Sequence, residues 1–312
     1  MESRSTASRS LVALAFVAVS VIWGSTYLGI RIALAGFPPF LIGAIRFLTA
    51  GAALCGYARL RGQRWPSLRE WGGSALVGGL FFVVGNGLLN VAELSVSSGL
   101  AAVLVATMPL WATVFSRLYG DSVTRREWTG IALGLAGVAV LNLGGELRAS
   151  GYGAALALFA PMGWGLGSIL SKRLRLPSGP MTVGAQMLSG GVAVLFISVA
   201  LGEKWPASPS SRSVSAVAYL TVMGSLVGFT AYAFLLRHTR AAVATSYAYI
   251  NPVVAILLGI WLGAEHLDTA SACGGVIVLA AVLLVSRGKQ APVPAVAAPC
   301  PTDSGQLRAA TR

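Results

Sequence analysis

The chain has 312 residues, of which 55% are hydrophobic and only 11% are charged, and its mean hydropathy is +0.75. This composition excludes an ordinary soluble domain, in which about a quarter of the residues are charged. It predicts an all-α polytopic membrane protein, so the net charge of +13 has to be explained first by where the basic residues lie relative to a membrane.

Taken in chain order, the apolar residues fall into ten segments of a length suited to crossing a hydrocarbon core of about 30 Å. Short connections that contain Gly, Pro and Ser separate them. We therefore expect ten transmembrane helices, at residues 11–35, 39–59, 72–92, 98–119, 127–144, 152–171, 181–202, 214–236, 242–263 and 270–287.

The two ends of the chain need separate interpretation. Arg4 and Arg9 precede the first apolar segment as they would in a signal peptide, but no convincing cleavage site stands before Trp23, so we expect this helix to be retained. Residues 288–312 are rich in Pro and Ala and bury little surface, so we expect a disordered cytoplasmic tail.

The basic residues are divided very unevenly between the two sides of the expected membrane. One side receives only Arg148, Lys204 and Arg212. Because cytoplasmic loops are enriched in Lys and Arg, the pattern predicts that both termini are cytoplasmic, and no nucleic-acid partner is needed to explain the charge. The expected cytoplasmic residues are Arg4, Arg9, Arg59, Arg61, Arg64, Arg69, Arg117, Arg125, Arg126, Lys172, Arg173, Arg175, Arg237, Arg240, Arg287, Lys289, Arg308 and Arg312.

An internal duplication organises the sequence. Pro109, in GLAAVLVATMPLWATVFSRLYG, precedes Pro252, in AVATSYAYINPVVAILLGIWLGAE, by 143 residues. Trp23-Gly24 and Trp164-Gly165 form a second matching pair upstream, and two apolar runs match downstream. Repeated motifs in one order indicate two copies of a unit. We place these repeats at residues 12–144 and 152–287. Each has five helices, an odd number, so the second copy is inverted in the membrane, as in many secondary transporters.

Both prolines fall inside apolar segments. A proline cannot donate a backbone hydrogen bond, so Pro252 leaves the carbonyl of Ala248 without its helical partner. Such a group is costly in lipid, which predicts that helix breaks at Pro109 and Pro252 face protein or a wet cavity. The alternative is a pair of kinked helices that only pack against their neighbours.

Several motifs resemble one family. Ile22-Trp23-Gly24-Ser25-Thr26-Tyr27, the Pro38-Pro39 turn before Ala44-Ile45-Arg46-Phe47, and the two proline-containing runs are similar to the EamA-type transporters of the drug/metabolite transporter superfamily, and within it to YedA-like inner-membrane exporters. The resemblance covers roughly residues 12–287. It implies ten helices in two EamA repeats, a bacterial inner-membrane location and alternating access about a central cavity. It also implies transport of amino acids, other metabolites or drugs.

Polar and aromatic side chains concentrate in the segments around the two prolines. Asn86 and Asn90 are four residues apart and so share a helix face, as do Tyr247 and Asn251. Each could simply hydrogen-bond a neighbouring helix, but their concentration favours a cavity with aromatic walls and few polar anchors. The expected cavity residues are Trp23, Ser25, Thr26, Arg31, Asn86, Asn90, Thr107, Trp164, Ser168, Gln186, Tyr232, Tyr247, Tyr249 and Asn251.

Charges within or next to the membrane are functional candidates by default. Arg31 and Arg46 would favour a carboxylate if they face the cavity, although either could extend to the interface and Arg46 could tie two helices together. Glu93 and Glu265 lie at outer helix ends, where they could serve as gate or proton sites or as helix-end contacts. No acid is expected at the bilayer centre, which argues against proton-coupled export of organic cations.

These observations favour a secondary transporter that exports a small metabolite, amino-acid-like or carboxylated, or a drug. A facilitator or importer is the alternative in the same class, and a non-transporting membrane scaffold or receptor is the alternative in another. Enzymatic activity, a cofactor and a metal are not expected, because no set of nucleophile, base or ligand residues gathers at one depth. The expected partners are a small-molecule substrate and the lipid bilayer; a homodimer is left open.

Overall fold

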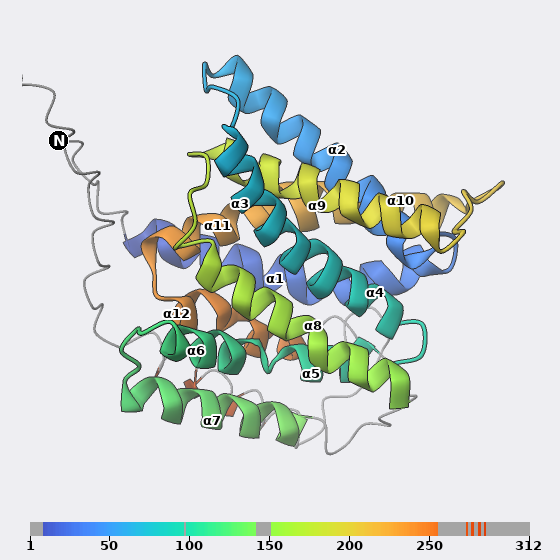
Figure 1. Ribbon diagram of the computed structural model, residues 1–312. Coiled ribbons are helices and arrows are strands. Elements are labelled where there is room, and N and C mark those ends of the chain that lie inside the picture. Colours follow the sequence, from blue (N-terminus) through green and yellow to red (C-terminus); the bar gives the residue numbers. More distant parts are fainter. Residues whose placement is uncertain are drawn as a thin grey trace, which may run out of the picture.

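The computed structural model describes residues 9–96, 98–141 and 151–254, with isolated positions at 273, 276, 277, 280, 281 and 284 (Figure 1). Glu265 and the tail at residues 288–312 lie outside the described residues, as does most of the tenth expected segment. Every element of the described chain is a helix. The all-α class predicted from composition is therefore confirmed.

The helices follow the expected segments closely, with interruptions inside some of them. The first part of the chain forms α1 (Arg9–Leu34), α2 (Pro39–Leu60), α3 (Leu68–Gly78), η1 (Gly79–Gly87), α4 (Leu88–Ala92), α5 (Ser98–Val105), α6 (Met108–Leu118) and α7 (Arg125–Leu141). The second part forms α8 (Gly151–Leu170), α9 (Pro180–Ala200), α10 (Ser211–Tyr219), η2 (Leu220–Val227), α11 (Gly228–His238) and α12 (Ala241–Thr245).

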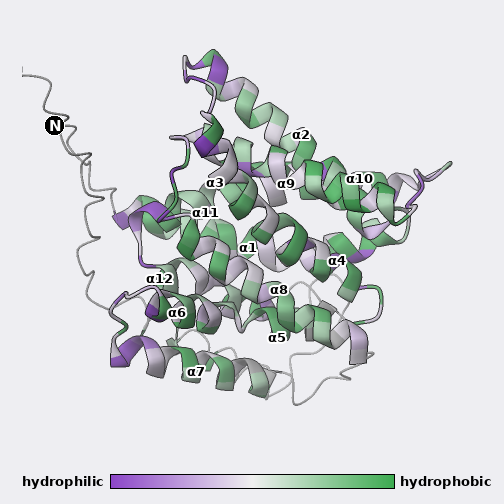
Figure 2. Cartoon of the chain, in the orientation of Figure 1, coloured by the Kyte–Doolittle hydropathy of each residue, from purple (hydrophilic) through white to green (hydrophobic). Residues whose placement is uncertain are grey.

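Within the described residues, six helices are long and apolar enough to cross a membrane: α1, α2, the continuous run Leu68–Ala92, α8, α9 and the continuous run Ser211–His238. Apolar residues cover the lengths of these helices, whereas hydrophilic residues gather near their ends and in the connections (Figure 2). This distribution is the one that a hydrocarbon layer flanked by water selects.

The helices run between two ends of a single bundle. The connections α2–α3, α6–α7, α8–α9 and α11–α12 lie at one end, on the left of Figure 1. We call it the basic end, because these connections carry Arg64, Arg125, Lys172 and Arg240. The connections α1–α2 and α9–α10 and the end of α4 lie at the opposite end.

Glycines bring α9 unusually close to two helices of the first part. A Cβ at Gly51 of α2 would lie 2.8 Å from the backbone nitrogen of Leu188, and one at Gly190 of α9 would lie 2.6 Å from the carbonyl oxygen of Gly78. No ordinary Cβ fits at these distances, so the positions require glycine. Small residues of this kind allow close backbone packing between membrane helices, and here they fasten the two parts of the chain together.

The duplicated Trp-Gly motifs make equivalent contacts. A Cβ at Gly228 would lie 2.4 Å from Trp23 Nε1, and a Cβ at Gly85 would lie 2.6 Å from Trp164 Nε1. Gly85 and Gly228 are 143 residues apart, like the two prolines. Each tryptophan therefore packs on a glycine of the other part of the chain. The following glycines behave alike, since Gly24 approaches Val254 and Gly165 approaches Trp111.

Two π-helical segments occupy corresponding places in the two parts. The segment η1 interrupts the run from α3 to α4, and η2 interrupts the run from α10 to α11. π-Helical turns inside α-helices occur frequently at functional sites. Trp23 Nε1 donates a hydrogen bond to the carbonyl oxygen of Gly224 in η2 (2.9 Å). The segment η1 supplies Phe81, Phe82 and Asn86 to the centre of the bundle.

Candidate functional site

A small cavity lies where α1, α2, η1, α4, α5, α8, α11 and the helical residues after α12 meet. Its volume is about 30 Å³, which is room for little more than water. We call it the central cavity. Its lining consists of Trp23, Thr26, Tyr27, Ile30, Arg46, Asn86, Leu89, Val105, Trp164, Phe229, Tyr247 and Asn251.

The polar anchors of the central cavity differ in how fully they are hydrogen-bonded. Thr26 donates to the carbonyl of Trp23 (2.7 Å), and Asn86 donates from Nδ2 to the carbonyl of Phe81 (2.9 Å). Asn251 is buried and lies beside the Tyr27 hydroxyl, but its Oδ1 accepts no hydrogen bond within the described chain. A buried acceptor without a donor is costly, so Asn251 is the anchor best able to receive a ligand's N–H or O–H group.

Aromatic rings close the central cavity on the side that faces the basic end. The ring centroid of Trp23 lies 4.8 Å from that of Phe229, 4.9 Å from that of Tyr247 and 5.2 Å from that of Tyr232. The Tyr232 hydroxyl is fixed by a 2.6 Å hydrogen bond with Ser168. We call these four rings the aromatic plug.

A second, larger cavity lies beyond the aromatic plug at the basic end. It has a volume of about 240 Å³, and Phe229 lines both cavities. We call it the basic-end chamber. Its walls come from η1, from the connection that follows α8, from α9 and from α11. They consist of Phe81, Ser171, Lys172, Leu176, Thr182, Val183, Gln186, Phe229, Tyr232, Ala233, Leu236 and Arg237.

The opposite end has buried charges in place of a chamber. Arg46 is only 2% exposed, and its guanidinium lies 5.0 Å from the centre of the Phe47 ring. Glu93 is buried at the end of α4, and neither of its carboxylate oxygens accepts a hydrogen bond within the described residues. Electrostatic attraction links Glu93 to Arg31 and Arg46 without a direct ion pair. Arg31 itself is exposed and does not line either cavity.

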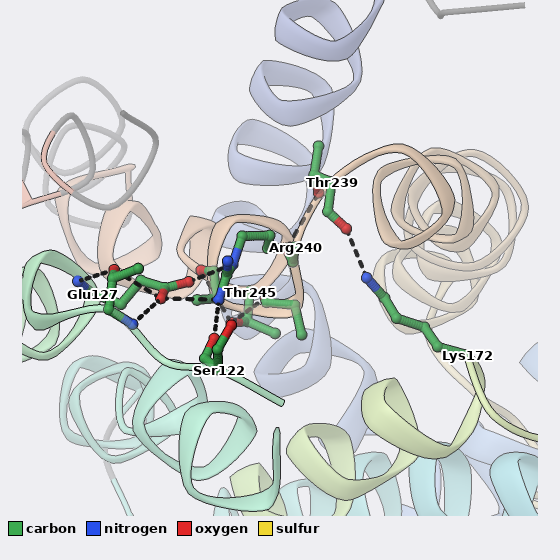
Figure 3. A network of polar contacts seen from close by, with 9 residues as sticks. Ser122, Glu127, Lys172, Thr239, Arg240 and Thr245 are labelled. Carbon is green, nitrogen blue, oxygen red and sulfur yellow. Dashed lines mark hydrogen bonds and ion pairs between the residues drawn. The ribbon is translucent and has the colours of Figure 1, made fainter. Parts of the chain in front are cut away.

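A polar network joins three connections at the basic end (Figure 3). Arg240 pairs with Glu127 (Nε to Oε1, 2.7 Å) and donates to the carbonyl of Ser122 (2.5 Å). Lys172 donates to the carbonyl of Thr239 (2.6 Å). An ion pair between Arg173 and Asp121, 2.6 Å long, adds a further link. The α6–α7, α8–α9 and α11–α12 connections are thereby held together.

Several residues expected at the cavity lie elsewhere. Ser25 shares a 2.6 Å hydrogen bond with Tyr219 of α10, and Asn90 donates to the carbonyl of Pro39 (2.9 Å) at the start of α2. Tyr249 packs against Gly134 of α7. Thr107 donates to the carbonyl of Leu104 (2.7 Å) in the last turn of α5. These contacts join helices or finish helix ends.

The helix interruptions lie near the two prolines but not at them. Between α5 and α6 the chain turns at Ala106 and Thr107, and Pro109 stands in the first turn of α6. After α12 the chain turns at Ser246, and Pro252 lies within the next helical stretch. The second interruption is therefore six residues before its proline, so Tyr247 and Asn251 belong to the same helical stretch.

Some lining residues had no signal of their own in the sequence. Phe81 and Phe229 stand in long apolar runs and look like ordinary core positions. Lys172 and Arg237 were counted only as cytoplasmic charges. The spacing of Phe229 and Tyr232, three residues apart on one helix face, is a signal that could have linked them.

Comparisons with known proteins bear on this site. The model of the EamA-like transporter family matches residues 10–143 and 151–287. Over 276 residues the chain is 45% identical to "Uncharacterized inner membrane transporter YedA" of Escherichia coli strain K12, covering 88% of this chain and 90% of that protein. It is 27% identical over 276 residues to "Probable terminal-alkyne amino-acid exporter" of Streptantibioticus cattleyicolor, with 88% and 92% covered.

A solved structure, described as "Crystal structure of protein", matches with a TM-score of 0.70 and 23% sequence identity. The match covers 89% of this chain and 97% of that one. At this identity the likeness establishes a common fold alone.

Proposed function

The chain belongs to the EamA-like transporter family of membrane transporters, and from that premise we propose that it is a secondary carrier that exports a small metabolite or drug across the bacterial inner membrane. We further propose that it has ten transmembrane helices in two inverted five-helix repeats, at residues 12–144 and 152–287. In this arrangement the basic end is cytoplasmic, as the distribution of Lys and Arg favours.

The central cavity carries the proposal. It lies where helices from both repeats meet, and it combines aromatic walls with the unpartnered Oδ1 of Asn251. Secondary transporters with inverted repeats place their substrate site in such a position. The aromatic plug separates this cavity from the chamber at the basic end, so the carrier would admit substrate from the cytoplasm when the four rings move apart.

The reciprocal Trp-Gly contacts support a rocking mechanism. Trp23 packs on Gly228 and Trp164 packs on Gly85, so equivalent contacts lie on the two sides of the cavity. Exchange between two packings of equivalent halves exposes a fixed site to each side in turn. We propose an amino-acid-like or otherwise carboxylated substrate, a class that the name of one relative, an amino-acid exporter, also supports.

Counterflow into proteoliposomes tests the function. Vesicles that contain the full chain are loaded with amino acids, organic acids or cationic dyes, and uptake of the labelled solute is followed. We expect counterflow of at least one carboxylated solute, and Asn251→Ala should lower its rate about tenfold, the effect of losing roughly 1.4 kcal/mol of hydrogen bonding.

Tyr249→Phe is the matched control, because this tyrosine is buried two residues away but packs on Gly134 outside the cavity. It should transport normally. Normal transport by Asn251→Ala and Tyr247→Ala would refute the cavity assignment, and absence of counterflow for every solute would refute the carrier.

A further inference from the structure

The basic-end chamber has an unbalanced charge. Lys172 and Arg237 stand in its wall, and none of its described lining residues is acidic. The nearest carboxylate that acts on Lys172 is Asp121, which is already paired with Arg173 at 2.6 Å. Glu127 is likewise paired with Arg240. Two cations therefore face one cavity without a carboxylate of the protein to neutralise them there.

Both cations are held in place by neutral oxygen atoms. Lys172 Nζ donates to the carbonyl of Thr239 (2.6 Å), and Arg237 Nη2 donates to the Thr182 hydroxyl (2.9 Å). The Thr182 hydroxyl in turn donates to the carbonyl of Pro177. An ammonium group has three donors and a guanidinium has five, so each side chain is positioned while donors remain for a ligand.

The inner part of the chamber is apolar. Phe229 and Tyr232, which belong to the aromatic plug, form its wall together with Phe81, and Leu236 and Val183 extend this wall. The volume of about 240 Å³ lies below the range of roughly 300–1,000 Å³ that encloses drug-sized ligands. The chamber thus fits a small molecule with one anionic group and an apolar body.

We propose that the basic-end chamber is a carboxylate-binding site in which Lys172 and Arg237 bind the anionic group and the aromatic wall receives the apolar remainder of the solute. The proposal rests on the proposed carrier function and adds to it. Recognition of the anion is assigned to this chamber, which a cytoplasmic solute would enter before the central cavity, and not to Arg31 or Arg46.

Binding of paired probes to the full chain in detergent tests the site. Each probe is a small carboxylate, such as 3-phenylpropionate, 4-methylpentanoate or N-acetyl-leucine, and its partner is the corresponding primary amide. We expect at least one acid to bind ten or more times more tightly than its amide. Lys172→Gln and Arg237→Gln should each weaken binding of that acid about tenfold, because each removes a charge-assisted hydrogen bond to the carboxylate.

Two further variants control for charge and folding. Arg175→Gln removes a charge from an exposed position of the same connection outside the chamber, and it should bind as the unaltered protein does. Lys172→Arg should retain the preference for the acid. Equal binding of every acid and its amide, or unaltered affinity in both glutamine variants, would overturn the proposal. Competition gives a further outcome. If phosphatidylglycerol micelles displace the bound acid and no other soluble carboxylate does, the chamber is a lipid site and the proposal is overturned.

The pH dependence gives an independent readout. Desolvation of the ammonium group by surrounding protein atoms lowers the pKa of Lys172 to about 8; Asp121 opposes this shift and Arg240 adds to it. Because Lys172 loses its charge as the pH rises through this value, affinity for the acid should fall between pH 7 and pH 9. The fall should be absent from Lys172→Arg. Constant affinity of the unaltered protein over this range would count against the site.

The two proposals fail in different ways. Acid-selective, Lys172-dependent binding without counterflow of any solute would leave the site standing and remove the carrier function. If counterflow is the same for acids and amides, and the same for the unaltered protein and the glutamine variants, the carrier function stands and the site is refuted.

Discussion

The two ends of the helix bundle are closed by different kinds of interaction. At the opposite end Arg46 and Glu93 are buried, and Glu203 accepts hydrogen bonds from the backbone N–H groups of Phe40 (3.1 Å) and Leu41 (2.8 Å) at the start of α2. At the basic end a chamber of about 240 Å³ lies inside connections that are joined by the half-exposed Arg173–Asp121 pair and by the largely buried Arg240–Glu127 pair.

This difference indicates which contacts break at lower cost. Exposed ion pairs contribute little and are screened by salt, whereas separating buried charges or exposing an uncapped helix start costs more. The Arg173–Asp121 pair is therefore the weakest of these contacts, and the buried Arg240–Glu127 pair and the contacts at the opposite end are stronger. Substitutions at each end, and at the centre that they share, test this comparison.

The largest effect is expected from Arg46→Met. The substitution removes a buried guanidinium that attracts the buried Glu93, and loss of one partner of buried charges costs about 3–5 kcal/mol. The double variant Arg46→Met/Glu93→Gln should recover most of this loss. Unfolding by denaturant in detergent measures both. Strictly additive losses would show that the two charges do not support one another, and Arg212→Gln, which removes an exposed charge at the start of α10, provides the control.

Alanine at the glycines beneath the tryptophans comes next. Gly85→Ala and Gly228→Ala would each place a Cβ within 2.6 Å of an indole nitrogen, and overpacking of this kind costs about 1–3 kcal/mol. Similar losses at both sites are expected if the two contacts are equivalent. Gly79→Ala, in η1 like Gly85 but with open space around it, should be nearly neutral. Thermal unfolding in detergent measures all three variants.

Glu203→Ala should have a smaller effect at the opposite end. It removes the carboxylate that accepts from the start of α2 and from Ser198 (2.7 Å), and loss of a helix N-cap costs about 1 kcal/mol. Thermal unfolding in detergent should show the shift. Lys204→Ala, at the neighbouring exposed position, is the control; an equal shift in both variants would deny Glu203 a capping role.

The smallest effect is expected from Asp121→Asn at the basic end. Its ion pair with Arg173 joins side chains that are 39% and 35% exposed, so the loss should stay below about 1 kcal/mol and shrink further as salt is added. Stability measured at low and high ionic strength checks this. A loss as large as that of Arg46→Met would contradict the contrast between the two ends.

Much of the fold was predictable from the sequence, because membrane spans need long apolar runs and the duplicated motifs mark equivalent places. The orientation of individual side chains was not. Tyr247 and Tyr249 looked equivalent, yet only Tyr247 lines the central cavity. In a helix surrounded by lipid and by apolar neighbours, hydrophobicity does not distinguish one face from another. The interruption at Ser246 then sets the rotation of the residues that follow.

The charged residues illustrate the same difficulty from the other side. Arg31 and Arg46 drew notice because charge inside a membrane is costly, but Arg31 is exposed. Lys172 and Arg237 were explained by topology alone, although both line the basic-end chamber. One basic side chain can satisfy the rule for cytoplasmic loops and also bind an anion, and only the helix packing around it separates these roles.

The reciprocal tryptophan contacts also constrain how the chain is made. Trp23 and its acceptor, the Gly224 carbonyl, are 201 residues apart. At synthesis rates of about 5–20 residues per second, the indole waits roughly 10–40 s before its partner leaves the ribosome. During that interval the first half lies in the bilayer before Trp23 can pack on Gly228 and before Trp164 can pack on Gly85. Biogenesis is therefore completed only when the second half inserts and fills these places.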